Sequence, residues 1–143
     1  MISRREILQR GIAATSLPLV TGIAWLPLQT ASARALEHTA LYKVLVDARF
    51  PAARSFGRQA QRRGEIVHEF NGDITSVWYE DLYLRWKKGP AAIAGLTAHG
   101  ALFCLERLSW DVGMRVVFRA EQRHEGHEPL HSWLIAPVAG RRA

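Results

Sequence analysis

The segment of residues 123–131 holds the densest set of side chains that could do chemistry, with three histidines and two glutamates interleaved. Imidazole and carboxylate groups are ligands for zinc, copper and nickel. The spacing of His124, His127 and His131 would let a loop wrap a transition metal, although it matches no zinc signature. The alternative is a polar hairpin loop whose histidines face water. The segment therefore supplies a candidate metal site with no established motif behind it.

A second candidate site consists of Asp47, Arg49, Asn71 and Asp73, which follow two expected strands. If these strands are neighbours in a parallel sheet, their carboxyl ends meet at the edge where such sheets bind ligands. An acidic pair with an arginine could then bind a polar solute or position a proton. The competing explanation is local, because aspartate caps helices and asparagine forms turns.

A third candidate site is a group of aromatic side chains in one expected helix. Helical spacing places Trp78 and Trp86 on one face, which we expect to lie in the core. Tyr79, Tyr83 and Arg85 then lie at the rim. Because tyrosine and arginine are enriched at the centres of protein interfaces, these three residues form a candidate interface.

The rest of the sequence carries no familiar catalytic signature. It lacks a glycine-rich phosphate loop, a GxSxG nucleophile elbow, a CxxC pair and a CxxCH haem-attachment motif. The single cysteine, Cys104, cannot form a disulfide within the chain. Its apolar neighbours predict a buried thiol that behaves as a small hydrophobic side chain.

The elements that must position these residues follow from hydrophobic periodicity. The small-residue segment 91–96 is expected to be a connection that leads to Thr97 as a helix cap. The order β-α-β-α-α-β-β predicts a single small α/β sandwich, with about four mixed strands covered by three helices. Strands are expected over residues 41–46, 65–70, 114–120 and 132–136, and helices over residues 51–63, 74–86 and 98–112.

The amino-terminal 33 residues have a separate pattern. An uncharged run covers residues 11–28, and Ala31 and Ala33 supply an Ala-x-Ala cleavage site. This arrangement resembles the twin-arginine (Tat) export signal. The residues that carry the targeting part of the resemblance are Ser3, Arg4, Arg5, Ile7 and Leu8.

The resemblance implies that the Tat machinery exports the chain, already folded, to the periplasm. Cleavage would remove residues 1–33, with transient membrane contact through the signal, and leave residues 34–143 as a single α/β domain. The alternative is an uncleaved signal that anchors the protein in the membrane. The domain would carry 16 basic and 12 acidic residues, a net charge of +4, against +6 for the whole chain. Nucleic acid is not expected as a partner of an exported domain.

These observations favour an exported, small, non-catalytic accessory subunit of a periplasmic enzyme complex, for which we expect redox chemistry. A chain with an export signal but no evident cofactor site could lend that signal to a larger partner subunit that lacks one. Two alternatives from other classes stay open. One is an independent metal-binding protein or enzyme that uses the histidine-rich loop and a transition metal. The other is a periplasmic solute-binding module that uses the polar edge.

Overall fold

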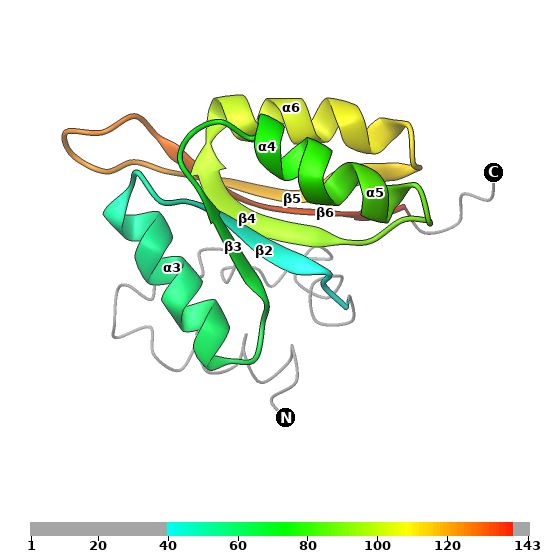
Figure 1. Ribbon diagram of the computed structural model, residues 1–143. Coiled ribbons are helices and arrows are strands. Elements are labelled where there is room, and N and C mark those ends of the chain that lie inside the picture. Colours follow the sequence, from blue (N-terminus) through cyan, green and yellow to red (C-terminus); the bar gives the residue numbers. More distant parts are fainter. Residues whose placement is uncertain (1–39, 139–143) are drawn as a thin grey trace.

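A five-stranded mixed sheet runs through the computed structural model of the protein, which describes residues 40–138 (Figure 1). The order across the sheet is β3-β2-β4-β6-β5. Strand β2 is parallel to β3 and β4, whereas β6 is antiparallel to β4 and β5. The predicted mixture of parallel strands and a final antiparallel pair is confirmed. The strands are β2 (Lys43–Asp47), β3 (Val67–Phe70), β4 (Ile93–Ala98), β5 (Met114–Gln122) and β6 (Leu130–Pro137).

The sheet is covered by helices, as the sequence predicted, and they lie on both of its faces (Figure 1). Helix α3 lies on one face and begins with a proline, whose fixed φ suits the first helical position. The other helices lie on the opposite face, which we call the face of the helical layer. The helices are α3 (Pro51–Arg62), α4 (Thr75–Val77), the π-helical segment η2 (Trp78–Leu82), α5 (Tyr83–Trp86) and α6 (His99–Trp110).

The predicted count of about four strands is wrong, because the segment expected to be a connection forms strand β4. All six residues of β4 are buried, and this strand lies in the middle of the sheet. Its sequence is rich in alanine and glycine, which are poor strand formers, so propensity concealed it. Thr97 is consequently part of the strand and is not the cap of α6, which begins after Ala98 without a side-chain cap.

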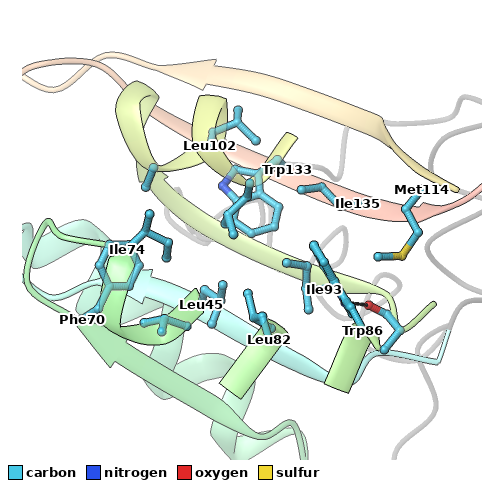
Figure 2. Packing of buried hydrophobic residues seen from close by; sticks show 14 residues of the cluster. Leu45, Phe70, Ile74, Leu82, Trp86, Ile93, Leu102, Met114, Trp133 and Ile135 are labelled. Carbon is cyan, nitrogen blue, oxygen red and sulfur yellow. Dashed lines mark hydrogen bonds between the residues drawn. The ribbon is translucent and has the colours of Figure 1, made fainter. Parts of the chain in front are cut away.

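The small residues of β4 make room for a large neighbour on the next strand (Figure 2). An added Cβ on Gly95 would lie 2.4 Å from the carbonyl oxygen of Leu45 and 2.6 Å from Cζ2 of Trp133. The Trp133 indole nitrogen donates a hydrogen bond to the Thr97 hydroxyl oxygen at 3.1 Å. The glycine is therefore required by close packing between three adjacent strands.

The segment 74–86 is helical, as predicted, but its middle turn is a π-helix. The carboxylate of Asp73 accepts a hydrogen bond from the Thr75 backbone N–H at 2.8 Å and so stabilises the turn before α4. The N-cap of α4 is Ile74, without a side-chain cap, so the prediction that Asp73 caps this helix is wrong. Within residues 40–138, no helix is long and apolar enough to cross a membrane.

Candidate functional site

Asp47, Arg49 and Asp73, three of the four residues predicted to form a polar edge, line one open pocket of about 300 Å³. Asn71, the fourth, is exposed and does not line this pocket. The pocket lies beyond the carboxyl ends of the parallel strands β2, β3 and β4. Its other lining residues are Gly72, Ile74, Thr75, Ala98, Gly100, Ala101, Cys104 and Glu128.

The pocket lies where the connections from the parallel strands diverge to opposite faces of the sheet. Helix α3 follows β2 and covers one face, whereas the segment α4–η2–α5 follows β3 and covers the other (Figure 1). The flanking strands β3 and β4 lie on either side of β2. In open α/β sheets, ligands bind outside the carboxyl ends of the strands at such a switch point.

The floor of the pocket contains a charged pair. The Asp47 side chain is fully buried, and its Oδ2 accepts a hydrogen bond from Nη2 of Arg49 at 2.7 Å. Hydrogen bonding to Asp47 raises the pKa of Arg49, so the guanidinium stays charged. Asp47 also accepts the Arg49 backbone N–H at 3.1 Å, which means that it stabilises a turn. The alternative that Asp47 caps a helix is wrong, because α3 starts after Phe50 with no side-chain cap.

The Arg49 guanidinium lies directly against the backbone of Gly72. Gly72 has a φ of +81°, and an added Cβ would lie 2.7 Å from Cζ of Arg49. A side chain at this position would therefore displace the guanidinium and strain the backbone. The turn after β3 thus fixes the arginine at the edge of the pocket.

One wall of the pocket is the amino terminus of α6. The first N–H groups of a helix have no partner within the helix and carry a partial positive charge. Ala98 supplies no capping side chain, and no acidic residue occurs in the first turn of α6. Gly100 and Ala101, in that turn, line the pocket.

Two exposed carboxylates at the pocket add negative charge beside these positive groups. Asp73 and Glu128 both line it. Hydrogen bonds from the Thr75 hydroxyl and backbone N–H lower the pKa of Asp73, so its carboxylate is ionised at neutral pH. The pocket therefore offers donors and a positive helix end to an anionic group, and carboxylates to a cationic group.

Cys104 also lines the pocket and is exposed, so the prediction of a buried thiol is wrong. The buried stripe of α6 consists of Ala101, Leu102 and Leu105. Position 104 lies beside this stripe. Because residues 101–105 are all apolar, the sequence does not show which of them face the core.

The three histidines predicted to hold a metal are divided between a loop and a strand. His124 and His127 belong to the β5–β6 loop, where the His127 backbone N–H donates to the His124 carbonyl oxygen at 3.1 Å. The His131 ring lies in β6 at 5.6 Å from the ring of His99. Among the described residues, no three His, Cys, Asp or Glu side chains are placed to share a metal ion.

The residues of the candidate interface differ in how far their side chains are exposed to solvent. Tyr79 and Tyr83 are 66% and 41% exposed, respectively. Arg85 is partly buried, since its Nη1 donates to the Gly89 carbonyl oxygen at 3.2 Å. Trp86 lies in the core, where its indole nitrogen donates to the Ala91 carbonyl oxygen at 3.0 Å (Figure 2). The two tyrosines therefore form the accessible part of this group.

Sequence reasoning missed a charged cluster at the amino end of β2. Asp81, in the π-helical segment, accepts a hydrogen bond from the Tyr42 hydroxyl at 2.5 Å and forms an ion pair with Lys43. The His68 Nδ1 atom lies 3.8 Å from the same carboxylate. Burial opposes ionisation of Asp81, but the hydrogen bonds from Lys43 and Tyr42 outweigh it and lower the pKa. No spacing in the sequence joins these residues, because three separate elements supply them.

The chain matches no protein-family model, no curated protein and no solved structure. The predicted export signal (Ser3, Arg4, Arg5, Ile7 and Leu8) and the cleavage residues Ala31 and Ala33 lie outside the described residues.

Proposed function

We propose that the protein is an exported solute-binding module whose pocket takes a small molecule carrying both a carboxylate and a protonated amine. One observation carries the proposal: Asp47, Arg49, Asp73 and the uncapped start of α6 line the same pocket. Free α-amino acids are the simplest molecules with these two groups.

The anionic group of the ligand is assigned to the α6 wall. Backbone N–H groups at a helix start form a ready site for carboxylate or phosphate, and the helix dipole adds to the attraction. The Arg49 hydrogen bonds to Asp47 use Nε and Nη2. Its Nη1 is thus available as a further donor.

The cationic group of the ligand is assigned to the exposed carboxylates of the pocket. These are Asp73 and Glu128, since Asp47 is already neutralised by Arg49. The two exposed carboxylates would repel a dianion, which favours a zwitterion over an inorganic phosphate.

Isothermal titration calorimetry with the common amino acids tests this assignment. We expect at least one to bind, and we expect its analogues without the amine or without the carboxylate to bind at least about tenfold more weakly. Glu128→Gln should lower the affinity for the amino acid and leave the affinity for its amine-free analogue unchanged. Absence of binding by every amino acid would contradict the proposal.

A second function, an accessory subunit of a larger periplasmic enzyme complex with redox chemistry, is favoured by the exposure of Tyr79 and Tyr83. Large exposed aromatic side chains are typical of protein interfaces. The protein recovered from the periplasm should then carry a larger subunit in stoichiometric amount, and a Tyr79→Ser, Tyr83→Ser variant should lose it. Recovery of the unmodified protein without any such subunit would exclude this function.

The export route is tested separately, by replacing Arg4 and Arg5 with lysine. We expect the variant to accumulate in the cytoplasm with its signal intact, because the proposed route depends on the paired arginines. A variant that reaches the periplasm normally would show that the resemblance to a twin-arginine signal is misleading.

A further inference from the structure

Most of the large exposed apolar side chains belong to the helices that cover one face of the sheet. Six such side chains are exposed among the described residues, and five of them belong to η2, α5 or α6. The sixth, Ile66, lies in the α3–β3 connection, away from the helical layer (Figure 1). Large exposed apolar side chains gathered on one side of a protein are typical of interaction surfaces. The five residues are Tyr79, Tyr83, Leu84, Phe103 and Trp110.

The helices of this layer run in the same direction. The segment α4–η2–α5 starts after the carboxyl end of β3, and α6 starts after the carboxyl end of β4. Both run back along the sheet to the opposite end of its strands, where the next strand begins (Figure 1). The layer therefore has one end with two helix starts and one end with two helix terminations.

The end with the helix starts is acidic. Asp73 and Glu128 lie at the pocket there, and Glu125 follows in the β5–β6 loop. All three are exposed. The arginines nearby are already paired within the chain, Arg49 with Asp47 and Arg123 with a glutamate at 2.8 Å.

The end with the helix terminations is basic and aromatic. The guanidinium carbons of Arg107 and Arg115 lie over the Trp110 ring, at 4.7 and 5.6 Å from its centre. Lys87 lies over the Tyr83 ring at 5.1 Å. Lys88 and Arg107 are exposed, and Asp111 offsets only part of this charge.

We propose that two copies of this chain pair through their helical layers, around a two-fold axis that sets the helices antiparallel. The pairing does not require the proposed solute, although Asp73 and Glu128 belong both to the pocket and to the acidic end. It is the alternative to a larger partner subunit on Tyr79 and Tyr83. An antiparallel two-fold arrangement places the basic end of each copy against the acidic end of the other, twice over. It also opposes the helix dipoles favourably and covers the five apolar side chains.

The charge pattern selects a second copy over a membrane surface. Anionic lipid attracts basic residues but repels the carboxylates at the other end of the same layer. A second copy is self-complementary because it carries both ends. The exposed apolar side chains then supply the affinity, and the charges set the orientation.

Sedimentation velocity on the purified protein, without added solute, tests the pairing. We expect a concentration-dependent dimer that weakens as salt is raised. Reversal of the basic end (Lys87→Glu, Lys88→Glu) or of the acidic end (Glu125→Lys, Glu128→Lys) should each weaken the dimer at least about tenfold. The variant with both reversals should dimerise again, because the complementarity is restored with opposite signs.

A matched pair of surface variants tests the apolar part. Phe103→Ser should weaken the dimer, whereas Ile66→Ser, at the exposed apolar position outside the helical layer, should not. Three results would overturn the inference: a monomer at every concentration, a fourfold charge variant that stays monomeric, or a monomer that sediments with anionic phospholipid vesicles. The pairing could fail in this way while amino acids still bind, so the two proposals are distinguishable.

Discussion

The two ends of strand β2 both carry charged clusters, but they differ in what the charges face. At the amino end, the Asp81 carboxylate accepts a hydrogen bond from Tyr42 and pairs with Lys43, and His68 lies nearby. The partners of this carboxylate therefore all lie within the chain. At the carboxyl end, Asp47 is paired with Arg49, but an uncapped helix start lies across an open pocket.

A cluster of titratable groups does not by itself indicate a binding site. The amino-end cluster is closed, and its hydrogen bonds hold the π-helical segment against the sheet. The carboxyl-end cluster is open, and it leaves donors and acceptors for a molecule from outside. Stability experiments should therefore report on the first cluster, and ligand experiments on the second.

The largest effect on stability is expected from Gly95→Ala. It would disturb both ends of strand β2, because β4 pairs with β2 along its length. The new methyl group would overlap the Leu45 carbonyl and the Trp133 ring, at a cost of about 3 kcal/mol in the free energy of unfolding. Gly100→Ala is the matched control, since a Cβ there meets nothing within 4 Å. Chemical denaturation should show it to be neutral or stabilised by about 0.5 kcal/mol.

Asp81→Asn should affect the amino end alone. It leaves the largely buried Lys43 ammonium without its counter-charge, so we expect a loss of about 2 kcal/mol of stability at pH 7. Because the pKa of Asp81 is lowered, its contribution is present above the ordinary aspartate pKa of 3.8 and disappears as the pH falls through the lowered value. The variant should therefore unfold with a weaker pH dependence in acid, whereas Glu80→Gln, at an exposed neighbouring position, should leave both quantities unchanged.

A smaller effect is expected near neutral pH, beside the carboxyl end. Burial, and then the neighbouring His99 and Arg119, lower the pKa of His131 against the opposite effect of Glu121. Its neutral form is favoured in the folded state, so stability should fall as the pH drops below about 6.5 and through the lowered pKa. His131→Gln should reduce this dependence in thermal denaturation at several pH values, whereas His127→Gln, in the exposed loop, should retain it.

The periodicity of the sequence predicted the elements whose apolar pattern is distinct. Helix α6, the β5–β6 pair and the parallel pairing of β2 with β3 followed from it. Strand β4 did not, because its side chains are small enough to pack under Trp133 and therefore lack a strand-like composition. The role of Gly95 depends on two other strands, which no local pattern contains.

The candidate site was predictable to the extent that topology places it. Asp47, Arg49 and Asp73 follow strands that are parallel, and parallel strands end at one edge. Glu128 and Gly100 could not be assigned to the pocket from sequence, because a loop and a helix from later in the chain bring them there. The proximity of Asp81 to Lys43 was hidden for the same reason.

The most direct test of the central claim, that the pocket holds a zwitterionic solute, is calorimetry on Gly100→Asp beside Gly100→Ala. The aspartate would place a carboxylate at the start of α6, where it stabilises the helix and occupies the site assigned to the ligand carboxylate. We predict that Gly100→Asp is at least as stable as Gly100→Ala and loses amino-acid binding, while Gly100→Ala retains it. Equal binding by the two variants would contradict the account.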